Sequence, residues 1–367
     1  MTKKIHDVIL AQEESRGKAF IEKIKGRSPL FVCVIGSTET AKIPGLSAAG
    51  KHPELTDYTP AADVELLLLS SCKCIKGVPV TPEGIPTPAL ITMSALKLAD
   101  IPLLVVSGGV KIKPHVPYLD LGGRPGGDIR TSKAVENPEE ILLRAKIAGE
   151  NLSKVADYLV VGESIPGGTT TALGVLLAMG IDAKGKVSSS MPNNPHELKI
   201  KTVKEGLKAS KVEFGSLAHD PLKAVSCVGD PMIPAFAGLV LGAAHKVPVL
   251  MAGGTQSGAV LAVVKAFNPY ILNNVAIGTT RWIIVDKNAD LKGIIAQIAS
   301  IPILAADLDF SRSKFEGLKA YEAGFVKEGV GAGGSAIAAI AKSEGTISKA
   351  ALLDEIERNY ERLAVSR

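Results

Sequence analysis

Residues 158–179 read YLVVGESIPGGTTTALGVLLAM and combine three features in one stretch. An apolar run comes first, a glycine-rich turn follows, and an apolar helical pattern begins after three consecutive threonines. A continuous apolar run rich in β-branched residues is typical of a strand that is buried on both faces of a sheet. The stretch therefore predicts a strand, a turn and a helix, which is the repeating unit of a parallel α/β sheet.

The same order recurs along the chain. Short runs rich in Val, Ile and Leu alternate with glycine-rich turns and helical stretches. This alternation predicts the α/β class: a mostly parallel, open, Rossmann-like sheet flanked by helices. The expected strands cover residues 30–35, 66–69, 103–106, 158–161, 224–228, 247–251, 282–285 and 302–305.

Both ends of the chain show helical spacing of apolar residues among charged ones, over residues 3–25 and 347–363. We expect these helices to form a small helical subdomain from residues 1–28 and 345–367. Residues 29–344 would then form an α/β catalytic domain. Separate packing of the two helices on the main domain is an alternative of equal weight.

Composition narrows the classes of partner. The chain has 367 residues, of which 46% are hydrophobic, so it can bury a sizeable core. A formal net charge of +5 without a dense Lys/Arg block, together with 4% aromatics, argues against nucleic-acid and membrane partners. The beginning of the chain has no apolar stretch typical of a signal peptide. The longest apolar run, 232–244, is too short for a membrane span. We expect a cytoplasmic protein.

Glycine and hydroxyl residues follow five of the expected strands. These turns lie at residues 36–40, 107–109, 162–171, 229–230 and 252–258. Ligands of open parallel sheets bind at the carboxyl ends of the strands, where glycine gives access to backbone N–H groups. The pattern indicates a site for a phosphorylated or nucleotide-like molecule, although glycine can also serve only to make tight turns.

The turn at Gly167, Gly168, Thr169, Thr170 and Thr171 is the best candidate for a phosphate site. A helix begins here, so backbone donors and the helix dipole both favour an anion. An ordinary threonine cap is the alternative.

The segment 328–336 is a glycine loop before a helix, and it would hold the Glu328 carboxylate as a general base. Taken alone, Glu328 would be better interpreted as an exposed surface residue. No His, Cys or carboxylate spacing in the sequence indicates a metal site, so we expect neither a metal nor a cofactor. Asp307 and Asp309 are interpreted as residues at a helix entry rather than as a metal pair.

Four stretches together resemble the nicotinate-nucleotide:dimethylbenzimidazole phosphoribosyltransferase family, in particular its divergent archaeal-type branch. The resemblance spans roughly residues 85–345. Its motifs are the phosphate loop at 162–170, Leu198 and Lys201 after the serines 188–190, the stretch 228–253, and Lys-Glu-Gly-Val-Gly-Ala at 327–332. The chain departs from the family pattern at Ile165-Pro166, Gly168, Asp230 and Ala252, and it lacks the histidine-rich stretch before the last motif.

The resemblance implies an enzyme that transfers phosphoribose from nicotinate mononucleotide to dimethylbenzimidazole or a related base. The products would be nicotinate and α-ribazole phosphate, a precursor of the lower ligand of cobamides such as vitamin B12. Glu328 would be the catalytic base. The implied substrate-binding residues are Glu163, Gly167, Gly168, Thr169, Thr170, Thr171, Lys201, Gly229, Asp230, Gly253, Gly254, Thr255, Gly329 and Gly331.

Two alternatives remain open at this point. A phosphoribosyltransferase that uses pyrophosphate-ribose phosphate and magnesium would normally carry two adjacent acids, whereas Glu163 stands alone. A non-catalytic nucleotide sensor of the same fold is compatible with the departures at Ala252 and Ile165-Pro166. In each case we expect a homo-oligomer, a dimer. The sequence does not identify the native acceptor base.

Overall fold

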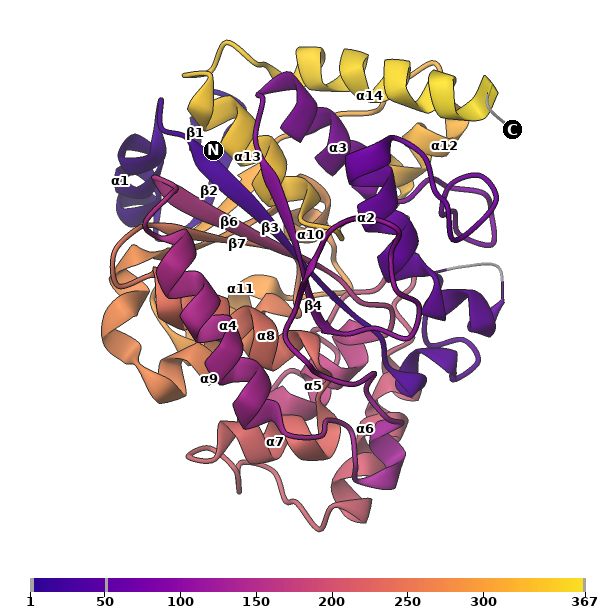
Figure 1. Cartoon of the computed structure of the whole chain (residues 1–367), viewed down its shortest axis with the longest axis vertical. Helices are drawn as coiled ribbons and strands as arrows, with labels where there is room; N and C mark the ends of the chain where they lie inside the picture. The colour runs from indigo at the N-terminus through magenta and orange to yellow at the C-terminus, as the bar shows by residue number, and fades with distance from the viewer. Residues whose placement is uncertain (1–2, 50–51, 366–367) are drawn as a thin grey trace.

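A single twisted sheet organises the computed structural model, which describes residues 3–49 and 52–365 (Figure 1). Within these residues the sheet has nine strands in the order β1-β2-β9-β8-β7-β6-β3-β4-β5. All pairs from β9 to β5 are parallel, whereas β1 and β2 add antiparallel strands at the β9 edge. The strands are β1 Lys4–Ile5, β2 Val8–Gln12, β3 Pro29–Gly36, β4 Leu103–Gly109, β5 Leu119–Asp120, β6 Tyr158–Ser164, β7 Val249–Ala252, β8 Val275–Thr280 and β9 Ile303–Ala306.

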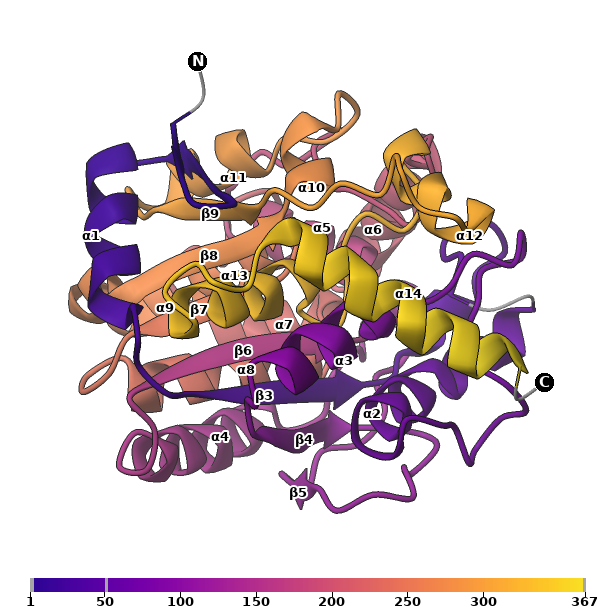
Figure 2. The ribbon, with the colours of Figure 1, turned by 90° about the horizontal axis from the view of Figure 1, so that it is seen from above.

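Helices cover both faces of the sheet (Figures 1 and 2). One layer holds α4 Pro138–Leu152, α5 Gly168–Ala178, α6 His196–Ala209, α7 Pro221–Val228, α8 Met232–Ala243, α9 Ser257–Phe267 and α11 Leu291–Ile298. The other holds α1 Glu14–Ile24, α2 Thr59–Leu69, α3 Ala89–Leu98, α13 Ala332–Lys342 and α14 Lys349–Val365.

The strand β3 shows why both layers are needed. Val32 and Val34 belong to the apolar core of the first layer, and Phe31, Cys33 and Ile35 belong to that of the second. Successive side chains of a strand point to opposite faces, so an uninterrupted apolar run demands cover on both sides. This arrangement confirms the predicted α/β class with a mostly parallel sheet.

Three of the expected strands are wrong. Residues 66–69, 224–228 and 282–285 belong to the helices α2, α7 and α10 Arg281–Val285, and β8 lies outside the expected strands. Apolar runs of this length fit a buried helix as well as a buried strand. At α7 a helix N-cap favours the helix over a strand: the Asp220 side chain accepts a hydrogen bond from the Lys223 N–H. The turn at 229–230 therefore follows a helix instead of a strand.

The expected helix over residues 3–25 is wrong in its first half. Residues 4–5 and 8–12 form β1 and β2, and only 14–24 are helical. His6 turns the chain with a φ of 51° between the two strands. By pairing with β9, β2 forms hydrogen bonds with backbone groups that would otherwise be unpaired at the edge of the sheet. These hydrogen bonds favour a strand here, although the spacing of the apolar residues is typical of a helix.

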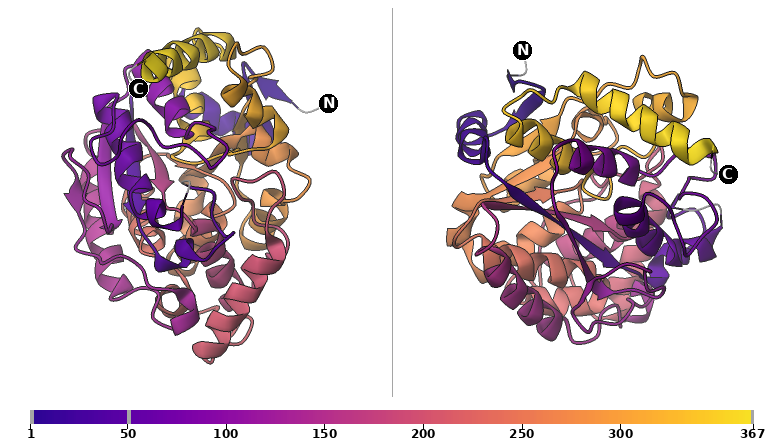
Figure 3. Two further views of the ribbon diagram at one scale, coloured as in Figure 1. Left: turned by 90° about the vertical axis from the view of Figure 1, so that its right-hand side faces the viewer. Right: turned by 45° about the horizontal axis from the view of Figure 1, so that its top comes forward.

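The two terminal helices pack on different neighbours. α1 contacts β2 and α13, whereas α14 lies along α3 (Figure 3). Leu352 and Ile356 of α14 nevertheless share an apolar core with Phe20 and Ile24 of α1. The division into a helical subdomain of residues 1–28 and 345–367 and a catalytic domain of 29–344 stays a prediction. Among the described residues, no helix is both long enough and apolar enough to cross a membrane.

Asp307 connects both ends of the chain to the sheet instead of capping a helix. Its buried carboxylate accepts hydrogen bonds from Lys4 Nζ at 2.7 Å and from Lys349 Nζ at 3.1 Å. Burial alone would raise the pKa of Asp307, but the two lysines outweigh burial and hold that pKa below its ordinary value. Asp309, in contrast, closes a local turn by accepting hydrogen bonds from Ser311.

Replacing Asp307 by Asn is expected to lower the free energy of unfolding by about 1.5 kcal/mol at neutral pH. We take the lower end of the range for charged hydrogen bonds because both lysines are partly exposed. Since folding lowers the pKa of Asp307, this contribution is present above the unfolded pKa and is lost as the pH falls through the folded pKa. Urea unfolding of both proteins at neutral and acid pH measures it. A stability difference that does not shrink in acid would contradict this assignment.

Candidate functional site

A cavity of about 1180 Å³ opens at the carboxyl ends of β6 and β7. Its wall draws on segments that are far apart in the sequence: residues within 47–49, 55–63, 72–88, 163–169, 188–190, 254–256 and 326–330, together with Ile283. Pockets for drug-sized ligands usually have volumes of about 300–1,000 Å³. The space is therefore sufficient for two small substrates bound side by side.

The turn between β6 and α5 forms one wall of this cavity. Gly167 has a φ of 78°, and a Cβ atom there would lie 3.0 Å from the Ala41 backbone. A Cβ on Gly168 would lie 2.7 Å from Ile165 and 3.0 Å from Gln256. Gly167 is therefore favoured by its positive φ, and Gly168 because a larger side chain would collide with Ile165 and Gln256. Both residues and Thr169 line the cavity at the start of α5, as the sequence predicted.

Eight of the predicted site residues line the cavity and the others do not. The lining residues are Glu163, Gly167, Gly168, Thr169, Gly254, Thr255, Glu328 and Gly329. Thr170, Thr171, Gly229, Asp230, Gly253 and Gly331 lie outside the lining. Thr171 Oγ1 donates to the buried Asp230 carboxylate, which also accepts hydrogen bonds from the N–H groups of Met232 and Ile233. Asp230 and Thr171 therefore support the wall from behind.

Lys199, two positions before the predicted Lys201, is the lysine that contacts the turn at the start of α5. Lys201 is exposed on α6 and does not line the cavity. Lys199 is fully buried, and its Nζ donates to Thr169 Oγ1 and to the Ser188 carbonyl, both at 2.6 Å. Lys199 is not itself a lining residue, but it contacts two residues that are, Thr169 and Ser188; Lys201, two positions further along the helix, points to a different side. Burial, and then the nearby charge of Lys327, lowers the pKa of Lys199 to about 7.

Glu328 belongs to another segment of the cavity lining, a loop with unusual backbone geometry. Val326 and Lys327 have φ values of 61° and 59°, and Val330 has a φ of 54°. The Lys327 N–H donates to the Phe325 carbonyl at 2.6 Å, and the Glu328 N–H donates to the Val326 carbonyl at 2.7 Å. These are two consecutive γ-turns with positive φ, which are rare and strained. Strained backbone of this kind clusters at functional sites.

The Glu328 carboxylate is held by neutral donors. The N–H groups of Gly329 and Gly333 lie 3.1 and 3.2 Å from Oε1, and Thr279 Oγ1 donates to Oε2 at 3.3 Å. Gly333 belongs to the first turn of α13, so the positive end of this helix faces the carboxylate. Burial nevertheless outweighs these hydrogen bonds and raises the pKa of Glu328 to about 7. A carboxylate with a pKa near neutrality is well suited to accept a proton.

Glu163 also lines the cavity. Burial, followed by the neighbouring charges of Asp230 and Glu328, raises the pKa of Glu163 well above its ordinary value. A raised pKa extends the pH range over which this side chain is protonated and can donate a hydrogen bond. Burial thus raises the pKa of both carboxyl groups, and the two interact, since the charge of Glu328 contributes to the raised pKa of Glu163.

The sequence interpretation missed a buried carboxyl group in the cavity lining, that of Asp63. Asp63 of α2 accepts hydrogen bonds from Ser164 Oγ at 2.7 Å and from Thr87 Oγ1 at 2.8 Å. Burial, only partly opposed by these two donors, raises the pKa of Asp63 to about 6. An acid inside the apolar run 61–69 was the available signal, but that run was partly assigned to a strand. In the part of the chain that the structure describes, no group of three His, Cys, Asp or Glu residues could hold a metal ion.

The fold and the cavity are those of an α/β protein with a ligand site at the carboxyl ends of its parallel strands. Residues 97–281 match a family model described as phosphoribosyltransferase, and the chain belongs to this family. Its relatives include UPF0284 proteins of archaea. The protein from Methanothermobacter thermautotrophicus is 47% identical over 88% of this chain and 90% of its own length. The protein from Sulfolobus acidocaldarius is 47% identical over 94% of this chain and 99% of its own length.

Solved structures agree with the fold. CobT from Thermus thermophilus has a TM-score of 0.60 at 17% identity, covering 94% of this chain and 92% of its own. A second structure, described as nicotinate-nucleotide-dimethylbenzimidazole phosphoribosyltransferase from the same organism, has a TM-score of 0.57 at 18% identity and covers 94% of both chains. The family resemblance and its divergent archaeal branch are thereby confirmed.

Proposed function

We propose that this protein transfers the phosphoribosyl group of nicotinate mononucleotide to a benzimidazole base, giving nicotinate and an α-ribazole phosphate. The observation that carries the proposal is the Glu328 carboxylate in the cavity wall, on a strained glycine loop and with a pKa raised to about 7 by burial. It faces a space large enough for a nucleotide and a base together. The description of the second Thermus thermophilus structure names this same activity for that protein.

The donor phosphate binds at the start of α5 in this proposal. Gly167, Gly168 and Thr169 line the cavity there, and the dipole of α5 favours an anion at this end of the helix. The Lys199 Nζ is already hydrogen-bonded to Thr169. A phosphate at this position stabilises the protonated ammonium of Lys199 and gains a charge-assisted hydrogen bond.

Glu328 acts as the general base in the transfer step. A ring nitrogen of the base attacks C1′ of the ribose as the bond from C1′ to the nicotinate nitrogen breaks. The electron pair of that bond leaves with the nicotinate ring, whose nitrogen becomes neutral. The N–H proton of the attacking base passes to the Glu328 carboxylate, and the protonated Glu163 can donate a hydrogen bond to the donor.

The direct test is incubation of the protein with nicotinate mononucleotide and dimethylbenzimidazole, followed by mass spectrometry. We expect α-ribazole phosphate and nicotinate in equal amounts. Turnover only with pyrophosphate-ribose phosphate and Mg²⁺ would replace this proposal by the first alternative. Tight binding of nicotinate mononucleotide without release of nicotinate would replace it by the sensor.

A further inference from the structure

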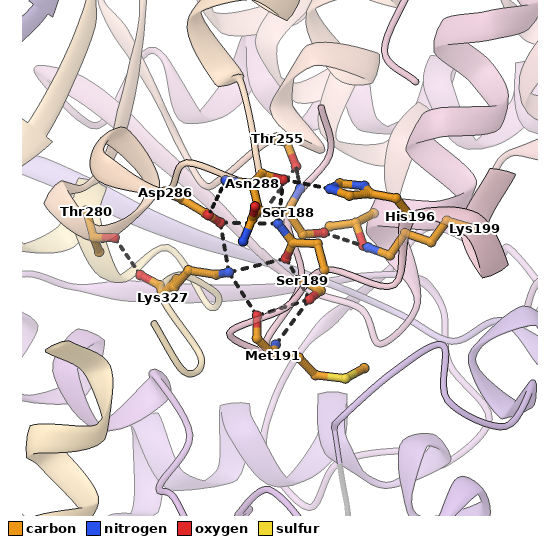
Figure 4. Close-up of polar contacts among 12 residues, drawn as sticks. Ser188, Ser189, Met191, His196, Lys199, Thr255, Thr280, Asp286, Asn288 and Lys327 are labelled. Atoms are coloured by element: carbon orange, nitrogen blue, oxygen red, sulfur yellow. Dashed lines mark hydrogen bonds and ion pairs between the residues drawn. The ribbon is translucent and has the colours of Figure 1, made fainter. Parts of the chain in front are cut away.

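Lys327 is a buried charge that the proposed chemistry does not use. Only 2% of the side chain is exposed. Its Nζ forms an ion pair with Asp286 Oδ2 at 2.8 Å and donates to the Met191 carbonyl at 2.9 Å and to Asn194 Oδ1 at 3.2 Å (Figure 4). The ammonium thus has three acceptors, which is its full hydrogen-bonding capacity.

Those acceptors belong to segments that are themselves fixed to the cavity wall. Ser189 Oγ donates to Asn194 Oδ1 at 2.8 Å, and Asn194 Nδ2 donates to the Asn288 carbonyl at 2.7 Å. The Asn288 N–H in turn donates to Asp286 Oδ1 at 2.9 Å. Figure 4 shows Lys327 between residues of the 188–191 segment and Asp286 and Asn288 of the loop after α10. Lys327 is therefore the point at which two separate segments meet the loop of Glu328.

The backbone at Lys327 explains why a strong attachment is needed. Lys327 is the central residue of the second γ-turn, directly before Glu328, and Val326 is the central residue of the first. Neither is a glycine, so the positive φ values are unfavourable at both positions. Such a conformation persists only where surrounding contacts determine it. The loop backbone is also anchored by the Val326 N–H on the Ser190 carbonyl and the Val330 N–H on the Glu163 carbonyl, both at 2.9 Å. Two hydroxyls add to this, since Thr280 Oγ1 donates to the Lys327 carbonyl and Thr92 Oγ1 to the Val330 carbonyl.

We propose that the ion pair between Lys327 and Asp286 is a positioning device, which holds the strained turns so that Glu328 faces the attacking base. This inference rests on the proposed function for the role of Glu328. Lys327 is accordingly a positioning residue and touches no substrate. A buried ion pair is often replaceable by neutral side chains without loss of stability, so stability alone does not account for it.

The test separates positioning from stability by neutralising both partners together. The variant with Lys327→Met and Asp286→Asn leaves no unpaired buried charge, so we expect it to fold with nearly the thermal stability of the wild type. Its kcat should fall by about 10²-fold, the effect of a misplaced catalytic group, while the KM for nicotinate mononucleotide stays nearly unchanged. Amide hydrogen exchange over residues 326–331 should accelerate, whereas exchange in α5 should not.

Asp307→Asn is the matched control, because it also removes a buried carboxylate that pairs with lysine. We expect it to lose stability and to keep the wild-type kcat. Should the double variant fail to fold, Asp286→Glu keeps both charges and displaces one carboxylate by a methylene group, and it should show the same changes to a smaller extent.

Wild-type kcat and wild-type exchange over 326–331 in a folded double variant would overturn the positioning role. If the wild-type protein has no transferase activity, the proposed function fails. Hydrogen exchange then tests this inference by itself. Faster exchange over residues 326–331 in the double variant supports the role of the ion pair in holding the loop, and unchanged exchange refutes it.

Discussion

Glu328→Gln is expected to lower kcat by about 10²–10⁴-fold, the usual contribution of a positioned general base. The amide keeps the size of the side chain and can still accept hydrogen bonds from Gly329, Gly333 and Thr279. It cannot take up the proton of the attacking base. The KM for nicotinate mononucleotide should change little, because in our proposal the donor phosphate binds to a different segment of the lining, at the start of α5.

The pH profile gives the same prediction an independent check. Because burial raises the pKa of Glu328 to about 7, wild-type turnover should increase as the pH rises through that value. The variant should lose this limb. Glu316→Gln, at a largely exposed side chain, is the matched control and should leave both the rate and the profile unchanged. Wild-type turnover in Glu328→Gln would mean that another group accepts the proton.

Lys199→Met is expected to raise the KM for nicotinate mononucleotide by roughly 10- to 100-fold, since a hydrogen bond to a charged group is worth about 1.5–3 kcal/mol. The Met side chain has a similar length but cannot hydrogen-bond to Thr169 or to a phosphate. Steady-state kinetics with varied donor measures the effect.

Lys201→Met is the control within the same helix. Lys201 is exposed and lies outside the cavity lining, so we expect a KM like that of the wild type. A larger effect at Lys201 than at Lys199 would restore the assignment that the sequence motif predicted and would contradict the orientation of α6.

The fold was largely predictable because its core strands are apolar on both faces. β3, β4, β6, β7 and β9 all lie in runs that the sequence identifies. The failures share a physical cause. A short apolar run does not distinguish a strand from a buried helix, as residues 224–228 show. The pairing of residues 8–12 with β9 is a contact between opposite ends of the chain, which no local pattern encodes.

The candidate site was predictable where one short segment contains all of the chemistry. The turn at Gly167–Thr169 and the loop of Glu328 are such segments, and both line the cavity. Lys199 was missed because the choice between two lysines depends on how α6 is rotated. Asp63 and the partners of Lys327 were missed because tertiary structure alone brings them to the cavity or to the loop.

A crystal structure of the Glu328→Gln variant with nicotinate mononucleotide and dimethylbenzimidazole tests the central claim most directly, because the slow variant should trap both substrates. We predict that the donor phosphate lies against Thr169 and Lys199 at the start of α5. A ring nitrogen of dimethylbenzimidazole should lie within hydrogen-bonding distance of the side chain at position 328 and face C1′ of the ribose. A donor phosphate bound away from α5, or a base that occupies the cavity without approaching position 328, would contradict the account.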